Sequence, residues 1–144
     1  MTEIVLPSHA NALGTIFGGV VMSWIDIAAA IAAQRYARSP AVTVSIDYLQ
    51  FICPIKVGYT VQIEAQVTYV GKTSMEIEVC VDAENSITGE VQRATHAFLT
   101  FVAVDKNGKP TNVAPLHPKS SEEMKKFQAA ERRRKERLNL FSKH

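Results

Sequence analysis

The sequence predicts an α+β fold in which an antiparallel β-sheet wraps one long helix. Two observations lead to this prediction. The residues between Gly18 and Ala33 are almost all apolar or small, as in a buried helix. The chain beyond Pro40 alternates apolar and polar residues, which is the period of strands with one face on a core. The links between these strands are too short to hold crossover helices, so we expect antiparallel pairing.

The length of 144 residues fits one domain, and a content of 47% hydrophobic and 21% charged residues is typical of a globular protein. The net charge of +2 conceals an asymmetry, because residues 119–144 contain nine Lys or Arg and four Glu, whereas residues 1–118 contain seven basic and ten acidic residues. We therefore expect a domain over residues 1–118 and a basic helix or tail over residues 119–144. A mildly acidic domain does not favour nucleic acid as a partner.

The helix is expected to lie in the core and not in a membrane. The apolar run from Val20 to Ala33 includes Ser23 and Asp26, and it is shorter than the roughly 20 apolar residues that a membrane span requires. Small residues give this helix a slim side against which strands can pack closely. They are Ala28, Ala29, Ala30, Ala32 and Ala33.

Four segments are expected to form the sheet. They run over Val42–Ile55, Val61–Tyr69, Met75–Ala83 and Val91–Val104, with turn-forming residues between them. A last segment, Ser121–Leu140, opens with Ser-Ser-Glu-Glu, which is typical of a capped helix start, and it is charged on nearly all sides. It predicts a surface helix or a partly disordered tail.

Several residue types bear on compartment and metal binding. Cys53 and Cys80 lie in apolar runs and are expected to be core thiols, not a disulfide framework, which favours a reducing compartment. The four histidines lack metal-ligand spacing to one another or to the cysteines, so no metal site is expected. The N-terminal residues have neither a basic segment nor an apolar one, so no secretory signal is expected and the cytoplasm is the predicted location.

Asp26 is the main candidate for chemistry, because it lies in an apolar helix with no Lys, Arg or His within one helical turn. A buried carboxylate without a partner is costly, so Asp26 is either a catalytic group or the acceptor for a donor in the core. Gly18 and Gly19 open the same helix, where free backbone N–H groups and missing side chains suit a developing oxyanion. Asn11, in the preceding loop, is by itself typical of a turn.

Other signatures are lacking. Neither G-x-G-x-x-G nor a complete phosphate loop is present, since Gln66 stands where the glycine five residues before Gly71 would be required. The G-x-S-x-G motif of serine hydrolases is also missing. Nucleotide hydrolysis and serine-based hydrolysis are therefore not expected.

Four stretches together resemble a known family. They are PSHANALGTIFGGVVMSWIDIAAAI, VTVSIDYLQFICPIKVGYTV, YVGKTSMEIEVCVDAE and ATHAFLTFVAVDKNGKP. They resemble the hotdog-fold acyl-CoA thioesterases, a group that includes bacterial broad-specificity acyl-CoA hydrolases and the mammalian cytosolic brain-type enzyme. The resemblance covers about residues 5–118 in order. It implies a hotdog fold, an acyl-CoA substrate, no separate cofactor because CoA is part of substrate and product, and a homodimer as active unit within a trimer of dimers.

The resemblance also implies roles for single residues. Asp26 would act as general base or, as an alternative, as a nucleophile, and Asn11 of the other protomer would orient the water or the carbonyl. The amides of Gly18 and Gly19 would form the oxyanion hole. Relatives place CoA contacts near the turn that holds Lys72, Thr73 and Ser74. The basic run over residues 132–135 is a second source of cations for the CoA phosphates.

Two departures from the family pattern concern substrate preference. Phe17 stands where several relatives have His, and Tyr59 stands where many have Asp. Two other functions stay open at this point: a non-catalytic acyl-CoA sensor on the same fold, and a hotdog hydratase or dehydratase, for which His9 is the nearest histidine to the loop.

Overall fold

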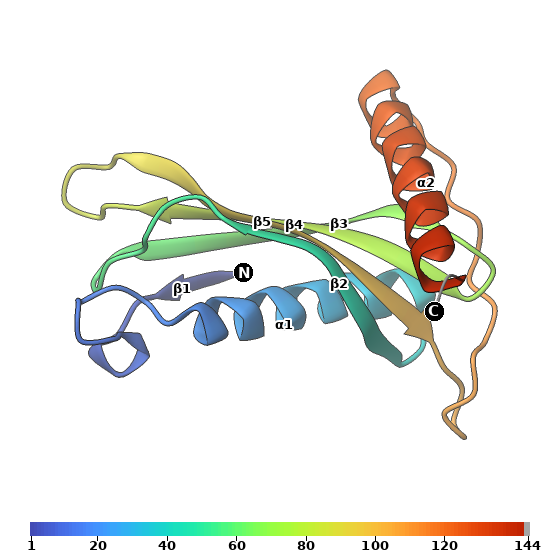
Figure 1. Ribbon diagram of the computed structural model, residues 1–144, viewed down its shortest axis with the longest axis horizontal. Helices are drawn as coiled ribbons and strands as arrows, with labels where there is room; N and C mark the ends of the chain where they lie inside the picture. The colour runs from blue at the N-terminus through green and yellow to red at the C-terminus, as the bar shows by residue number, and fades with distance from the viewer. Residues whose placement is uncertain (143–144) are drawn as a thin grey trace.

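The computed structural model describes residues 1–142 and contains one five-stranded sheet with a helix against each face (Figure 1). The elements in chain order are β1 (Thr2–Ile4), a 3-10 turn (Pro7–His9), α1 (Gly18–Ala37), β2 (Ala41–Phe51), β3 (Thr60–Val70), β4 (Ser74–Glu84), β5 (Val91–Ala103) and α2 (Ser121–Ser142). The predicted helix, four strands and C-terminal segment all appear within a few residues of their expected bounds. The last two residues of the predicted tail, 143 and 144, lie outside the described part.

The sheet has the strand order β1-β3-β4-β5-β2, and all its pairs are antiparallel as predicted. β2 pairs with β5 and not with the strand that follows it, so β2 forms one edge. β1 covers part of the other edge and was not predicted, because three residues are too few to display a period of two.

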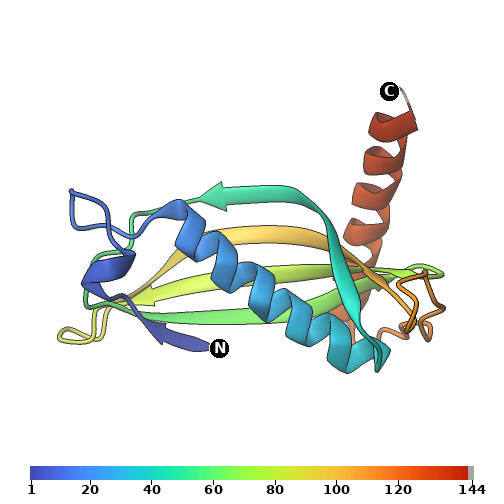
Figure 2. The ribbon, with the colours of Figure 1, turned by 90° about the horizontal axis from the view of Figure 1, so that it is seen from below.

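α1 crosses one face of the sheet diagonally (Figure 2). The residues of α1 that are buried are Val21, Trp24, Ile25, Ala28, Ala29 and Ala33. β4 turns its predicted apolar face towards α1, and Ile77, Val79 and Val81 on that face are fully buried. Each residue of this kind contributes about 1.5–3 kcal/mol of burial free energy, so this layer is the core.

The helix is not buried on all sides within one chain, contrary to the expectation from its composition. Met22, Ile27 and Ile31 of α1 are each more than a third exposed. The physical reason is that a single five-stranded sheet covers only one side of a helix. An apolar surface on α1 therefore lacks a partner within the chain.

The edge strand β2 adds to this unpartnered surface. Val42, Val44, Tyr48 and Phe51 are all about half exposed, and the strand presents unpaired backbone groups along its outer side. Exposed apolar edges of this length are usually covered by another chain.

α2 packs on the outer face of the sheet, opposite α1 (Figure 1). The guanidinium of Arg133 donates two hydrogen bonds to Glu76, of 2.8 and 3.0 Å, and lies over the ring of Phe98. Arg137 pairs with Asp47 at 3.1 Å. The basic segment thus neutralises carboxylates of the mildly acidic domain, and the side chain of Glu76 is only 4% exposed as a result. No helix among residues 1–142 is long and apolar enough to cross a bilayer.

Candidate active site

Asp26 lies on α1 beside the edge strand β2 and is half buried. Its Oδ1 accepts a hydrogen bond of 2.6 Å from the hydroxyl of Thr43. The sequence left open that Asp26 accepts from a donor elsewhere in the fold, and β2, the next element of the chain, supplies that donor. Hydrogen bonds to a charged acceptor are about twice as strong as neutral ones, so Thr43 orients the carboxylate.

Asn11 organises the loop that precedes α1. Its Oδ1 accepts from the backbone N–H of Leu13 at 2.9 Å, and its Nδ2 donates to the hydroxyl of Thr15 at 3.0 Å. These contacts are those of a turn-forming Asn, as its residue type predicts. The loop also pairs with the segment after β2, since the N–H of Ile16 donates to the carbonyl of Ile55 at 2.8 Å.

Gly18 and Gly19 form the first turn of α1, and both are exposed. Phe17 precedes them and gives no side-chain hydrogen bond to the helix start, so the first amides lack a side-chain cap. A Cβ on Gly18 would lie 3.3 Å from the Cζ of Phe51, which is tighter than most side-chain contacts, whereas a Cβ on Gly19 would meet open space. Gly18 therefore brings β2 and α1 close together, and Gly19 leaves room beside the amides.

A cavity of about 420 Å³ opens next to Gly18. Most of its wall is apolar, and the lining residues include Ile16, Val21, Phe51 and Ile55. Thr95 also lies on the wall, and its buried hydroxyl has no hydrogen-bond partner among the described residues. Apolar cavities with a few polar groups are typical of small-molecule sites.

The structure brings some of the predicted residues together and separates others. Gly18 lies at the cavity, and Asp26 follows eight residues later, about 12 Å further along the helix axis. No hydrogen bond within residues 1–142 joins Asn11 to Asp26. Within one chain, Asn11 in the loop and Asp26 on α1 are therefore not in contact with each other.

The predicted CoA contacts lie in the turn between β3 and β4. The turn is closed by a hydrogen bond from the N–H of Gly71 to the carbonyl of Ser74, and Lys72 is exposed. Thr73 uses its carbonyl to accept from the N–H of Ala103 at 3.0 Å. Among residues 1–142, no partner is described for the Lys72 ammonium or for the hydroxyls of Thr73 and Ser74.

Part of the basic run of α2 lies beside this turn. Arg134 has an Nη2 atom 3.4 Å from where a Cβ of Gly71 would stand, and its Nη1 donates to the hydroxyl of Tyr69 at 3.3 Å. Arg133 is occupied by Glu76. Arg134, from the basic run, thus lies beside the turn that contains Lys72.

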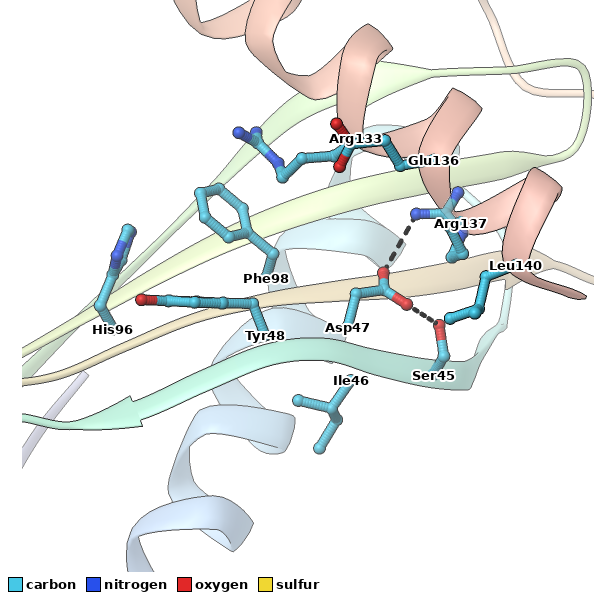
Figure 3. Close-up of a pocket in the computed structure, with 10 residues that line it drawn as sticks. All are labelled: Ser45, Ile46, Asp47, Tyr48, His96, Phe98, Arg133, Glu136, Arg137 and Leu140. Atoms are coloured by element: carbon cyan, nitrogen blue, oxygen red, sulfur yellow. Dashed lines mark hydrogen bonds and ion pairs between the residues drawn. The ribbon is translucent and has the colours of Figure 1, made fainter.

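A larger cavity, of about 630 Å³, lies between α2 and β2 on the outer face of the sheet (Figure 3). Tyr48 and Phe98 line it from the sheet, and Arg137 reaches Asp47 from α2, as the dashed line shows. It lies on the face opposite α1 and Asp26.

Thr43 is the functional candidate that sequence reasoning missed. A Thr in a strand is ordinary, and no spacing within the sequence connects it to a helix residue 17 positions earlier. The sequence contains one hint of Thr43: Asp26 has no basic residue within one helical turn, so a donor to its carboxylate had to come from another element.

Comparison with known proteins gives the family. A model of the thioesterase superfamily matches residues 13–90. The uncharacterized acyl-CoA thioester hydrolase YkhA of Bacillus subtilis is 44% identical over 138 residues, which span 96% of this chain and 80% of that protein. The crystal structure of an apo-hexameric acyl-CoA thioesterase superposes with a TM-score of 0.93 at 43% identity, covering 97% of this chain and 90% of that one.

A further solved relative is the acyl-CoA hydrolase of Staphylococcus aureus in complex with butyryl coenzyme A, coenzyme A and coenzyme A disulfide. It has a TM-score of 0.89 at 35% identity and covers 99% of this chain and 88% of its own. Variants of that enzyme in which an Asp, a Thr or an Asn is replaced by Ala also match. These similarities extend over nearly the whole chain and agree with the helix-on-sheet architecture, and the chain belongs to the thioesterase superfamily, among its hotdog-fold acyl-CoA thioester hydrolases.

Proposed function

We propose that this protein hydrolyses acyl-CoA to a carboxylic acid and free CoA, with Asp26 as the general base. The observation that carries the proposal is the oriented carboxylate: Asp26 is half buried in an apolar helix and receives a 2.6 Å hydrogen bond from Thr43. In the proposed step Asp26 takes a proton from water, whose oxygen attacks the thioester carbonyl. The C–S bond then breaks, and CoA leaves as its thiolate.

The solved variants of the Staphylococcus aureus enzyme support this choice of residues. Their replaced Asn, Asp and Thr are separated by 15 and 17 positions. Asn11, Asp26 and Thr43 have the same residue types and the same separations in this chain. The agreement of three types and two spacings favours a shared polar set.

The oxyanion hole is assigned to the start of α1 in the protomer that supplies Asn11, because Gly18 and Asp26 of one chain lie about 12 Å apart along the helix. The amides of Gly18 and Gly19 have no side-chain cap, and the space beside Gly19 is open to a substrate carbonyl. The acyl group would then extend into the apolar cavity next to Gly18. A thiolate is a good leaving group, so the proposed reaction needs neither a strong general acid nor a cofactor.

Asn11 is proposed to act in the site of a partner protomer, where it would orient the water or the carbonyl. This requires a dimer, and the exposed apolar residues of α1 and β2 supply a surface for one. The hexameric acyl-CoA thioesterase among its relatives supports assembly beyond the dimer, which we propose to be a trimer of dimers. The two cysteines are free thiols, which suits the proposed cytoplasmic location.

The CoA phosphates are assigned to the turn between β3 and β4. Lys72, Thr73 and Ser74 present an ammonium and two hydroxyls there, and Arg134 adds a guanidinium from α2. Arg is well suited to phosphate because its planar group donates two parallel hydrogen bonds. This pairing combines the two cation sources that the sequence left as alternatives.

The proposal is tested by incubating the protein with a panel of acyl-CoA esters and a thiol-reactive dye. Release of free CoA by wild-type protein, and its loss in Asp26→Asn, supports the hydrolase. Binding of the esters without release of thiol would identify a sensor. Hydration of an enoyl-CoA without thiol release would identify a hydratase.

A further inference from the structure

Three side chains with metal-binding atoms meet on the outer face of the sheet, away from Asp26. Glu78 and Cys80 are two residues apart on β4, so they point to the same face. His96 lies directly opposite Cys80 on β5. The Nε2 of His96 is 3.0 Å from a carboxylate oxygen of Glu78, and one ligand atom from each of the three residues lies within 4.8 Å of the others.

We propose that Glu78, Cys80 and His96 form a binding site for a divalent cation of the zinc class. Thiolate, imidazole and carboxylate are the donor set that Zn²⁺ and Co²⁺ take in proteins. Three protein ligands leave a fourth position for water, as in open zinc sites. The three side chains are partly exposed, and metal binding requires them to rotate so that the donors move from their present separation to a tetrahedral one.

The cluster is accessible from solvent. A hollow of about 370 Å³ borders Glu78 and Cys80 and gives a cation a path to them. Glu64 lines the same hollow and is the residue opposite Cys80 on β3, so the row Glu64, Cys80 and His96 crosses three strands. The carboxylate of Glu64 adds negative charge at the mouth of the site, which favours a cation.

Lys126 of α2 occupies part of the position that the cation needs. Its Nζ lies 3.2 Å from Oε1 of Glu78 and donates to the side chain of Gln66 at 3.1 Å. A divalent cation beside Glu78 repels this ammonium. Metal binding therefore replaces the ion pair between Lys126 and Glu78, which helps to hold α2 on the sheet, with a bond from Glu78 to the metal. Arg93 lies nearby but is held by Asp82 at 2.6 Å.

Linear spacing did not predict this site, because its ligands come from two strands. The sequence contains no C-x-x-C or H-x-x-x-H pattern. Only the register of β4 and β5 puts Cys80 opposite His96. The site is independent of the proposed hydrolase mechanism, since Asp26 lies on the opposite face of the sheet.

Cobalt is the probe for the test, because its visible absorption reports both geometry and thiolate ligation. The purified protein, first treated with a chelator, is titrated with Co²⁺ and then with Zn²⁺. We expect one Co²⁺ per chain, tetrahedral visible bands, a thiolate-to-cobalt charge-transfer band, and displacement of the cobalt by zinc.

Variants identify the ligands. Cys80→Ser should abolish the charge-transfer band, and His96→Gln should weaken cobalt binding by about tenfold or more. Cys53→Ser is the matched control, because Cys53 is the only other cysteine, and it should leave the spectrum unchanged. Lys126→Met should tighten cobalt binding, because it removes the competing charge. Far-ultraviolet circular dichroism verifies the fold of each variant.

The proposal is overturned if wild-type protein gives no charge-transfer band, or if the band persists in folded Cys80→Ser or disappears in Cys53→Ser. It is also overturned if folded His96→Gln binds cobalt as tightly as wild type. Each result is independent of thioester hydrolysis, which is measured separately.

Discussion

The hydroxyl of Thr43 donates a 2.6 Å hydrogen bond to Oδ1 of Asp26, and this bond connects the edge strand β2 to the central helix α1. β2 is held in place by β5 along its inner side. The position of the carboxylate therefore depends on the sheet as well as on the helix. Among residues 1–142, no donor to Oδ2 of Asp26 is described, so this oxygen is available to a water.

Thr43→Val keeps the shape of the side chain and removes the donor. We expect kcat to fall about tenfold with KM nearly unchanged, because a misoriented base affects the reacting water more than substrate binding. Thr43→Ser should restore most of the loss, since it returns the hydroxyl. Steady-state kinetics with one acyl-CoA ester gives kcat and KM for the wild type, Thr43→Val and Thr43→Ser. A Thr43→Val enzyme with normal kcat would mean that Asp26 is oriented without this bond.

Asp26→Asn removes the basic group with little change of shape. We expect kcat to fall by about 10²- to 10⁴-fold, which is the usual contribution of a positioned general base. Thermal unfolding should show that the variant still folds. Substantial turnover by folded Asp26→Asn protein would exclude the residue as the base.

Mixed subunits test whether Asn11 and Asp26 of one site come from different protomers. Asn11→Ala and Asp26→Ala proteins should each be inactive alone. After denaturation and joint refolding in equal amounts, about a quarter of the sites should contain both native residues, because half of the dimers are mixed and each has one intact site. Activity is compared with that of wild type refolded in the same way. If mixed dimers are demonstrated by mass spectrometry and remain inactive, each site is built within one chain.

Lys72→Ala and Arg134→Gln are expected to raise KM for acyl-CoA severalfold with little change in kcat. The CoA phosphates are remote from the reacting carbonyl, so contacts to them stabilise ground and transition states equally. Arg132→Gln is the matched control, because Arg132 is exposed and belongs to the same basic run. A thioester of the pantetheine portion alone, which lacks the nucleotide, should not distinguish the variants from wild type. Equal KM values for CoA esters in all four proteins would place the nucleotide elsewhere.

The ion pair of Arg133 with Glu76 holds α2 on the sheet. Arg133→Met leaves a carboxylate that is 4% exposed without its guanidinium partner, and we expect a loss of about 3 kcal/mol in the free energy of unfolding. Within the described part of the chain, the hydroxyl of Thr68 is then the one donor left to the carboxylate of Glu76, at 2.7 Å. The double variant Glu76→Gln with Arg133→Met should recover part of the loss, which urea unfolding measures as a coupling between the two positions. Additive effects of the two single changes would show that the pair does not couple α2 to the sheet.

Much of the secondary structure could be predicted from the local order of apolar and polar residues. The alternation in β3 and β4 predicted these two strands and, over most of their length, the face that each one buries, because a burial period of two follows from backbone geometry. The apolar run predicted α1 itself but not the face that it buries, because the run is apolar on nearly all sides. The acidic domain and the basic tail were also visible in the order of charges. The contact between the domain and the tail could not be predicted, since its partners Glu76 and Arg133 are separated by 57 residues.

The sequence by itself determined which residues are chemically unusual: a lone Asp in an apolar helix, two glycines at its start and a basic C-terminal segment. Only the tertiary structure decided what each of them contacts. Thr43 reaches Asp26 because β2 pairs with β5 at the edge of the sheet, and Cys80 faces His96 because of the register between β4 and β5. Register and strand order arise from long-range packing, and a one-residue slip would turn every such side chain to the other face, so no local pattern specifies these contacts.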